Sequence, residues 1–487
     1  MPVAVSPFQR TFLALAALAA ATPASAGSIT SFTTGDLIID TVTGSTLDAA
    51  SPLTLQEFHL GAGGSSATSV GTFTLPQTSS GANWAISGEY GSASEDFLQL
   101  SGNGHLLTIM GYGVNAATFN AAPVSTYGNK ALGQTTSVPG GAYTVVPRVV
   151  AAIGANGAVD TSTAVLNFAN TNNPRSAYTV DGSSFYVSGQ SASKTDPTQG
   201  VQFVPRGGST GVTINNQTDT RFVTANNGTL YVSRDYNPPS GGNQNFTGVV
   251  QLGSSSVLPT SAVSTPTHIV PPASPASSGG NNGSINLTTA LANGVNNSRI
   301  SSFVYLSPEQ YFFASPTVLY VADSGRPKNG NANKAALGEG GLQKWVLNTT
   351  TGVWSLEYDL FKGLNLVNNA LADPAHPTNP GVTGLFGLTG LVVGGQVELF
   401  ATSYGLNELS PSYLYEITDT LSATTPGANE QFTTLFSAPT NVSIRGVSFA
   451  PTPAPAPAIG QGLVSLGGLI AAGARALRAR RRSQGKA

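Results

Sequence analysis

Four arginines recur at equivalent places in the chain, and their spacing gives them the clearest potential for shared chemistry. Residues 27–450 hold eight arginines, and each of these four lies at or just before the start of a short apolar strand. If such strands open successive repeat units, the four guanidinium groups meet at one mouth of a central channel. They would then bind an anion, such as an acidic sugar or a phosphate-bearing group, or bond oxygens of neighbouring units. The four are Arg175, Arg221, Arg299 and Arg445.

Three further charged residues are weaker candidates for the same binding site. Asp323 ends an apolar strand, Arg326 follows it in a turn, and Lys344 lies in the next apolar strand. All three surround the fifth copy of the repeat described below. We therefore treat them as secondary members of the predicted site.

Two pairs of acidic residues resemble the paired carboxyl groups of a glycosidase. Glu95 precedes Asp96, and Glu357 lies two residues before Asp359. Adjacent or alternate acids in strand-like sequence are more typical of a solvated surface, so we predict no catalytic residue from them. The chain has four scattered histidines and no cysteine, and it lacks a His-Glu-x-x-His or phosphate-loop motif. The sequence therefore predicts no metal site and no cofactor.

The elements that would position these residues are short strands in a repeat. An apolar or aromatic cluster followed by small polar residues returns six times. Later copies have an apolar strand before them, at 97–100, 176–180, 222–225, 301–306 and 384–392. A further apolar strand, a turn and an alternating strand follow, and no segment of 27–450 has a helical period. The six copies lie at 36–40, 106–111, 185–189, 230–233, 319–323 and 399–403.

Four short antiparallel strands per unit predict an all-β fold, a single β-propeller. We expect six four-stranded blades, with seven as the alternative because the repeat length is loose. A pair of β-sandwiches and a β-helix are the other all-β candidates. The first copy lacks a preceding strand, and residues 444–449 supply one, so the C-terminal strand should pair with the N-terminal blade and remove the exposed edges. The Ser/Gly/Asn-rich stretch 271–297 is expected to be an insertion loop in blade four or five.

Composition agrees with a turn-rich β-protein. The chain has 57 Gly, 31 Pro and only 9% charged residues, without a collagen period, and its aromatic content suits a large core. Residues 27–450 hold 14 basic and 23 acidic residues, whereas the last residues carry a basic cluster. An acidic body excludes the general electrostatic signature of a nucleic-acid-binding protein.

The N-terminus reads as a secretory signal peptide covering residues 1–26. Arg10 supplies the positive region, residues 11–21 the apolar region, and Ala24-Ser25-Ala26 the small-residue cleavage site. The mature protein should begin near Gly27 after signal peptidase acts. We therefore expect an exported protein.

The C-terminus reads as a Pro/Ala spacer at 451–457, a weak transmembrane segment at 458–474 and a basic tail at 475–487. This order resembles the Pro-Glu-Pro (PEP-CTERM) sorting signals of Gram-negative bacteria, which an exosortase reads. The motif region is Pro-Ala-Pro-Ala-Ile-Gly-Gln-Gly-Leu at 455–463, so it is a variant without the central Glu. The resemblance implies an exosortase-type partner and a membrane anchor before processing; a plain single-pass anchor is the alternative.

The body contains the motifs Leu-Tyr-Val-Ser at 230–233, Gly-Leu-Gln-Lys-Trp at 341–345 and Arg-Gly-Val-Ser-Phe at 445–449. Through these motifs it also resembles a family of bacterial exported propeller proteins of unknown activity. The resemblance implies the ring fold and export to the periplasm, cell surface or medium, and it implies no catalytic residue.

Together these features predict a non-enzymatic binding or scaffold module in the cell envelope, with an acidic polysaccharide or a protein as its partner. A polysaccharide lyase or hydrolase is the alternative from the enzyme class. A structural coat protein is the third hypothesis. An enzyme would require a clustered acid and base at the channel mouth.

Overall fold

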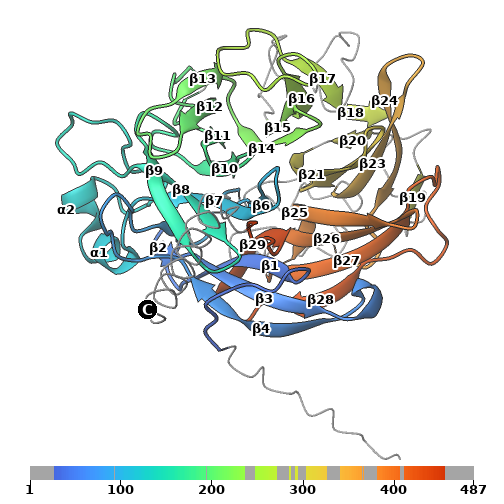
Figure 1. Cartoon of the computed structure of the whole chain (residues 1–487), viewed down its shortest axis with the longest axis horizontal. Coiled ribbons are helices and arrows are strands. Elements are labelled where there is room, and N and C mark those ends of the chain that lie inside the picture. Colours follow the sequence, from blue (N-terminus) through green and yellow to red (C-terminus); the bar gives the residue numbers. More distant parts are fainter. Residues whose placement is uncertain are drawn as a thin grey trace, which may run out of the picture.

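Six antiparallel sheets surround one axis, so the predicted six-bladed propeller is confirmed (Figure 1). The alternative with seven blades is wrong. The computed structural model describes residues 27–92, 94–193, 195–235, 247–270, 284–286, 291–293, 303–305, 307–325, 340–364, 366, 381–405 and 411–455. Residues 1–26, predicted to be a signal peptide, most of the predicted insertion 271–297 and residues 456–487 lie outside the described residues.

Blades 1 to 3 form the first half of the ring. Blade 1 consists of β29 (Val442–Phe449), β1 (Leu37–Thr43), β3 (Thr54–Leu60) and β4 (Ala67–Thr74). Blade 2 consists of β6 (Gln99–Leu100), β7 (Leu106–Tyr112), β8 (Arg148–Gly154) and β9 (Val159–Val165), with β5 (Ser87–Glu89) paired to β7 and β2 (Ala50–Pro52) paired to β5. Blade 3 consists of β10 (Pro174–Tyr178), β11 (Ser184–Gly189), β12 (Gly200–Pro205) and β13 (Val212–Asn215).

Blades 4 to 6 complete the ring. Blade 4 consists of β14 (Thr220–Asn226), β15 (Thr229–Asp235), β16 (Thr247–Leu252) and β17 (Thr267–Val270). Blade 5 consists of β21 (Pro308–Ser315), β22 (Val318–Asp323), β23 (Gly341–Asn348) and β24 (Val353–Leu360), with β19 (Leu291–Asn293) parallel to β24. Blade 6 consists of β25 (Val382–Val393), β26 (Gln396–Gly405), β27 (Tyr413–Thr420) and β28 (Thr433–Ser437), and β18 (Ser284–Asn286) pairs with β20 (Phe303–Tyr305) outside the blades.

The ring closes as the sequence predicts. β29 pairs antiparallel with β1, with Leu37 opposite Phe449 and Ile39 opposite Val447. The C-terminal strand is therefore the inner strand of the N-terminal blade. This pairing removes the two sheet edges that an open ring would expose.

The six copies of the sequence repeat correspond to the second strands β1, β7, β11, β15, β22 and β26. Two expectations about the connections are wrong. The inner strand of blade 5 is β21 and not the segment 301–306, because the chain reaches the axis only at Pro308. In addition, two short helices, α1 (Ala116–Ala121) and α2 (Pro123–Tyr127), lie in the connection after β7.

These helices are explained by their ends rather than by apolar periodicity. The Asn115 side chain accepts a hydrogen bond from the Thr118 amide at 2.8 Å and caps α1. Pro123 opens α2, and Gly128 ends it with a φ of 80°. Each helix is only five or six residues long, too short for a sequence period to show.

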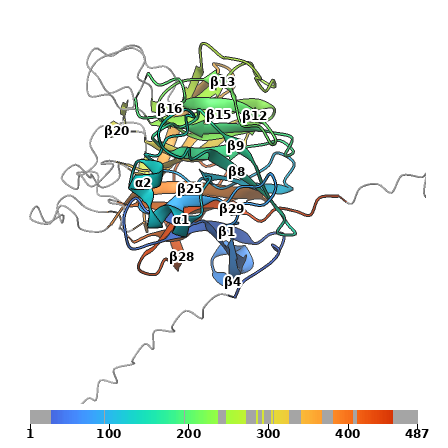
Figure 2. The same cartoon turned by 90° about the vertical axis from the view of Figure 1, so that its left-hand side faces the viewer.

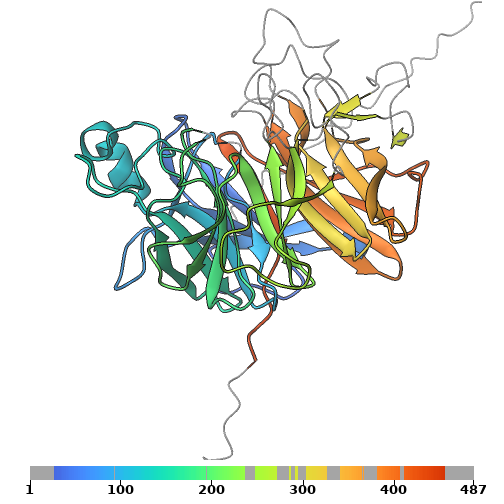
Figure 3. The same ribbon diagram turned by 90° about the horizontal axis from the view of Figure 1, so that it is seen from above.

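The two faces of the propeller can be told apart by the segments that extend from them. The helices α1 and α2 lie on one face, here called the helix face, and residues 450–455 leave from the opposite one, the tail face (Figures 2 and 3). The inner strand β10 begins at the helix face, and its turn at Asp181 reaches the tail face. At about 3.3 Å per residue, these ends lie roughly 20 Å apart.

Aromatic side chains fill the axis between the two faces. Phe97 stacks on Phe386 with ring centroids 4.2 Å apart and lies 5.7 Å from Phe222, which in turn meets Tyr311 edge-on at 5.3 Å. The four residues come from blades 2, 6, 4 and 5, and all are buried. Within the described residues, the axis is therefore a packed core rather than an open channel.

Candidate functional site

Three of the four predicted arginines lie on inner strands, near the helix face. Arg175 is on β10, Arg221 on β14 and Arg445 on β29, with exposures of 2%, 4% and 3%. Arg299 lies outside the described residues. The three are buried and do not line an open mouth. They separate into a network around Arg175 and Arg221 and a second cluster around Arg445.

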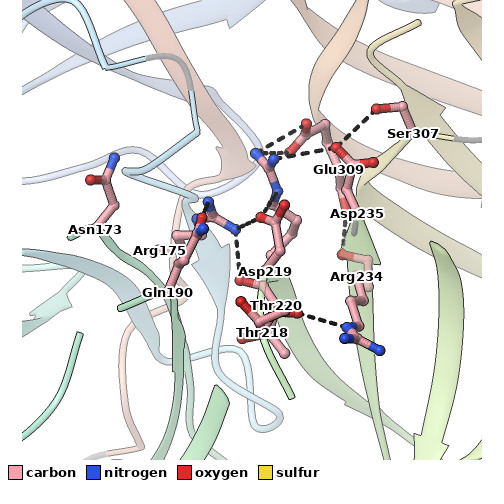
Figure 4. A network of polar contacts seen from close by, with 12 residues as sticks. Asn173, Arg175, Gln190, Thr218, Asp219, Thr220, Arg234, Asp235, Ser307 and Glu309 are labelled. Atoms are coloured by element: carbon pink, nitrogen blue, oxygen red, sulfur yellow. Dashed lines mark hydrogen bonds and ion pairs between the residues drawn. The ribbon is translucent and has the colours of Figure 1, made fainter. Parts of the chain in front are cut away.

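The first network joins blades 3, 4 and 5 (Figure 4). Arg175 donates through Nη1 to the Thr220 carbonyl at 3.1 Å and to Asp219 Oδ1 at 2.5 Å. Arg221 Nε lies 3.0 Å from the same Asp219 oxygen, and its terminal nitrogens lie 3.3 Å from Asp235 Oδ2 and 3.4 Å from Glu309 Oε1. Two guanidinium groups are thus matched by three carboxyl groups. We name Arg175, Asp219, Arg221, Asp235 and Glu309 the arginine network.

Burial sets the protonation behaviour of this network. Desolvation raises the pKa of Glu309 to about 7, although Arg221 and Arg175 lower it. Burial and the neighbouring Arg221 charge lower the pKa of Arg175, although Asp219 opposes them. Burial alone would lower the pKa of Arg221, but Asp219 and Glu309 outweigh it and raise the pKa. The carboxyl groups therefore hold the two positive charges in place.

A repeated hydroxyl bond fixes the same strands. Ser188 in β11 donates to the Arg221 carbonyl, and Ser233 in β15 donates to the Glu309 carbonyl at 2.6 Å. Thr402 in β26 donates to the Arg445 carbonyl at 2.6 Å. In each case the second strand of one blade holds the inner strand of the next. These hydrogen bonds and the ion pairs of the arginine network connect neighbouring blades. We call such a connection a joint between blades.

The second cluster lies between blades 1 and 2 and is mainly acidic. Arg445 donates through Nη2 to the Glu89 carbonyl at 3.2 Å. The charged groups acting on one another here are Arg445, Asp40, Glu89, Glu95 and Asp96, the Arg445 cluster. Among the described residues, no hydrogen-bond partner is found for either carboxyl oxygen of Asp40 or Asp96, or for Nε and Nη1 of Arg445.

Burial raises the pKa of every carboxyl group in this cluster. The pKa of Asp40 rises to about 8 because of desolvation, which the Arg445 charge only partly offsets. The pKa of Glu89 also rises to about 8, through desolvation and the charge of Glu95. Burial likewise raises the pKa of Glu95 and of Asp96. The cluster can therefore hold protons near neutral pH.

The solvated surface expected for the acid pairs is wrong for three of the four residues. Glu95 and Asp96 have no exposed surface, and Asp359 is 1% exposed, whereas Glu357 is partly exposed. Glu95 accepts a hydrogen bond from the Tyr112 hydroxyl at 2.7 Å. The inward position follows from the short strand β6, which takes the chain to the axis directly after Asp96.

Among the buried charged residues that sequence reasoning missed, Asp40 had a readable signal and Arg148 had none. Asp40 occupies, in the first copy of the repeat, the place that Ser188, Ser233 and Thr402 occupy in three other copies. In those three copies this position holds a hydroxyl group that bonds the next blade. The sequence therefore showed that the first copy has a carboxyl group there instead. Arg148 had no such signal: it is fully buried, and its nitrogens donate to loop carbonyl oxygens, including that of Thr135 at 2.9 Å.

Of the weaker candidates, Asp323 lies next to the arginine network, since Ser307 bonds both Asp323 and Asp235, whereas Lys344 lies in a separate contact between blades 5 and 6. Asp323 accepts from the Ser307 amide at 3.0 Å and from Gln343 at 2.8 Å, which fixes the start of β21. Lys344 is fully buried between blades 5 and 6, where Nζ lies 3.0 Å from Asp419 and donates to the Tyr358 hydroxyl at 2.9 Å. Arg326 lies outside the described residues.

In the part of the chain that the structure describes, no group of three or more His, Asp or Glu side chains has an arrangement that could hold a metal ion. Likewise, none of the helices present there is long and apolar enough to cross a membrane, and the segment 458–474 lies outside this part.

No protein-family model and no curated protein matches the chain. Solved structures to which it is similar include the β-propeller domain of the Trilobed protease from Pyrococcus furiosus, 7% identical over 82% of this chain and 86% of that one, with a TM-score of 0.31. AztD from Citrobacter koseri is 10% identical over 87% and 100%, with a TM-score of 0.31. The GH43 protein BlXynB from Bacillus licheniformis is 9% identical over 75% and 58%, with a TM-score of 0.32. These distant likenesses are to propeller proteins and carry no argument about function.

Proposed function

We propose that the chain is an exported, envelope-anchored or surface-displayed propeller that acts as a non-enzymatic binding or scaffold module. Its partner is an extracellular polysaccharide or a protein. The signal-like residues 1–26 and the spacer, apolar run and basic cluster after residue 450 support export and anchoring. The variant sorting signal supports processing by an exosortase-type enzyme.

The observation that supports the binding function is that the buried arginines on the inner strands are paired with carboxyl groups of neighbouring blades. Arg175 and Arg221 form ion pairs with Asp219, Asp235 and Glu309, and these contacts connect three blades. A site for an acidic sugar needs positive charge in excess, whereas here the carboxyl groups balance the guanidinium groups. The charged residues thus support a rigid ring, and a rigid ring suits a platform for binding.

A polysaccharide-acting enzyme is the second candidate, and the Arg445 cluster favours it. Glu89 and Glu95 lie together, with Glu95 Oε1 accepting from the Glu89 amide at 3.1 Å, and burial raises the pKa of both carboxyl groups. Such groups suit proton transfer at neutral pH. A purely structural coat protein is the third candidate.

Activity and binding assays with one panel of polysaccharides separate the candidates. We expect saturable binding without new reducing ends or unsaturated uronic acids. Turnover that disappears in Glu95→Gln, with an unchanged melting temperature, would contradict the binding function and establish the enzyme. Neither binding nor turnover would favour the coat protein.

Localisation is tested separately from activity. Amino-terminal sequencing of envelope-associated protein should begin near Gly27. Removal of residues 458–487 should release the protein from the membrane fraction. A retained Met1, or a truncated protein that stays with membranes, would contradict export or anchoring by the tail.

A further inference from the structure

A cavity of about 1080 Å³ lies on the tail face, at the opposite end of the inner strands from the arginine network. Its walls come from the turns that join strands within blades 2 and 3. The segment before β1, at 31–32, and the segment after β29, at 453–454, also line it. Asn103 lies in the β6–β7 turn, Asn156 in the β8–β9 turn and Asp181 in the β10–β11 turn. The volume is slightly above the usual range for small-molecule sites, which suits an extended ligand.

Polar side chains of this cavity are held by their own turns, which leaves other atoms available. Asn103 Oδ1 accepts from the His105 amide at 3.1 Å, and Asn156 Oδ1 accepts from the Ala158 amide at 3.1 Å. Asp181 Oδ1 accepts from the Ser183 amide at 2.9 Å. Over the described residues, the structure gives the Nδ2 groups of both asparagines and Oδ2 of Asp181 no hydrogen bond. Preorganised donors and acceptors of this kind match hydroxyl groups.

The charges of the cavity do not favour an acidic ligand. Its lining has the charged residues Asp160, Asp181 and Arg206, and Arg206 Nε already lies 2.5 Å from Asp160. The remaining Asp181 carboxylate would repel an anionic sugar. A neutral, hydroxyl-rich ligand meets no such repulsion and has both donors and acceptors to bind.

An exposed tryptophan follows a cavity-lining residue in the chain. Trp84 is 40% exposed, whereas Trp345 and Trp354 are buried at 1% and 8%. Its neighbour Asn83 lines the cavity, and the Trp84 carbonyl accepts from the Thr161 hydroxyl at 2.7 Å, which fixes this loop to β9. An indole ring at a polar rim can cover the apolar face of a sugar ring.

We propose that the tail-face cavity binds a neutral saccharide, with Trp84 packing on a sugar ring and Asn103, Asn156 and Asp181 binding its hydroxyl groups. This inference rests on the proposed binding function and gives it a ligand class and a place. The site lies far from the arginines on which the sequence-based prediction relied.

The test is titration of the purified full-length protein with cellopentaose, maltopentaose and mannopentaose, followed by tryptophan fluorescence and calorimetry. We expect one of the three to bind saturably and to change the fluorescence. Trp84→Ala should weaken this binding about tenfold or more, since the loss of an aromatic contact of about 1.4 kcal/mol corresponds to tenfold. Trp84→Phe should retain most of the affinity, and Asp181→Asn should weaken it without changing the melting temperature.

The matched control is Tyr143→Ala. Tyr143 is 51% exposed, and it lies in the connection after β7, which leaves from the helix face. This variant should bind as the wild type does. Binding that survives both Trp84→Ala and Asp181→Asn would overturn the site but leave the binding function intact. No binding of any of the three sugars by the wild type would overturn the saccharide class; Glu95-dependent cleavage of them would overturn the proposed function itself.

Discussion

Replacing Arg221 by Gln tests whether the arginine network is a joint between blades. The substitution removes ion pairs of 3.0, 3.3 and 3.4 Å to Asp219, Asp235 and Glu309. Breaking a buried ion pair by removing one partner costs about 3 to 5 kcal/mol, because the other charge stays buried without compensation. Each carboxyl group keeps another partner here, for example Ser307 for Asp235 at 3.0 Å. We therefore expect a loss of about 3 kcal/mol in the free energy of unfolding, the lower end of that range.

The loss should depend on pH in a defined direction. Burial raises the pKa of Glu309 to about 7 in the wild type, and removal of the Arg221 charge raises it further. At pH 5 this carboxyl group is protonated in both proteins, so the loss of its Arg221 partner adds little to the cost of the substitution. At pH 8 the wild type has an ionised Glu309 beside the positive charge of Arg221. The variant has no charge at position 221 to stabilise the ionised form. The difference in stability should therefore be larger at pH 8 than at pH 5.

Urea unfolding followed by tryptophan fluorescence measures this difference. The control is Arg206→Gln, which removes an ion pair to Asp160 from a side chain that is 61% exposed. Exposed pairs of this kind contribute about 0 to 1 kcal/mol, so the control should remain close to the wild type. If Arg221→Gln is no more destabilising than the control, and instead loses affinity for an acidic oligosaccharide, the reasoning is refuted.

Three other predictions follow from buried or strained residues. The pKa of Asp40 is raised to about 8, so its contribution to stability is present at acidic pH and lost as pH rises towards 8; melting temperatures should fall from pH 5 to pH 8, and a rise would contradict this. Lys344→Met should cost about 3 to 5 kcal/mol in urea unfolding, because it leaves the Asp419 carboxylate buried without its ammonium partner, and Asp419→Asn in the same chain should recover part of the loss. Gly157→Ala places Cβ 2.2 Å from a backbone oxygen, at a residue with a φ of +73°. It should lower the melting temperature more than Gly394→Ala, since Gly394 also has a positive φ but has open space around it. Equal losses would show that the clash at Gly157 has no effect.

The fold was predictable because its signal is repeated. Six copies of a strand pattern, with the unpaired strand at 444–449, indicate a closed ring, since neither end can otherwise cover its sheet edge. The inner strand of blade 5 was not predictable in this way. Residues 303–305, before β21, are apolar and do form a strand, β20, but this strand pairs with β18 outside the blades, and only packing at the axis distinguishes it from β21.

The candidate site was predictable only in part. The positions of Arg175, Arg221 and Arg445 at the starts of inner strands followed from the repeat. Their partners did not, because Asp219 comes from a turn and Glu309 from the strand that was misplaced. The burial of Glu95 and Asp96 likewise depends on how blade 2 meets blade 1. These contacts arise between blades, and a pattern within one repeat carries no information about them.

The most direct test of the account is a titration of the wild type and of Arg221→Gln with a pentasaccharide series, one neutral and one of polygalacturonate, at low and physiological salt. Arg221 belongs to a joint between blades in this account, and binding takes place on the tail face. We predict that a neutral sugar binds both proteins with the same affinity and little dependence on salt. Salt-dependent binding of the acidic sugar by the wild type, lost in a folded Arg221→Gln variant, would contradict it.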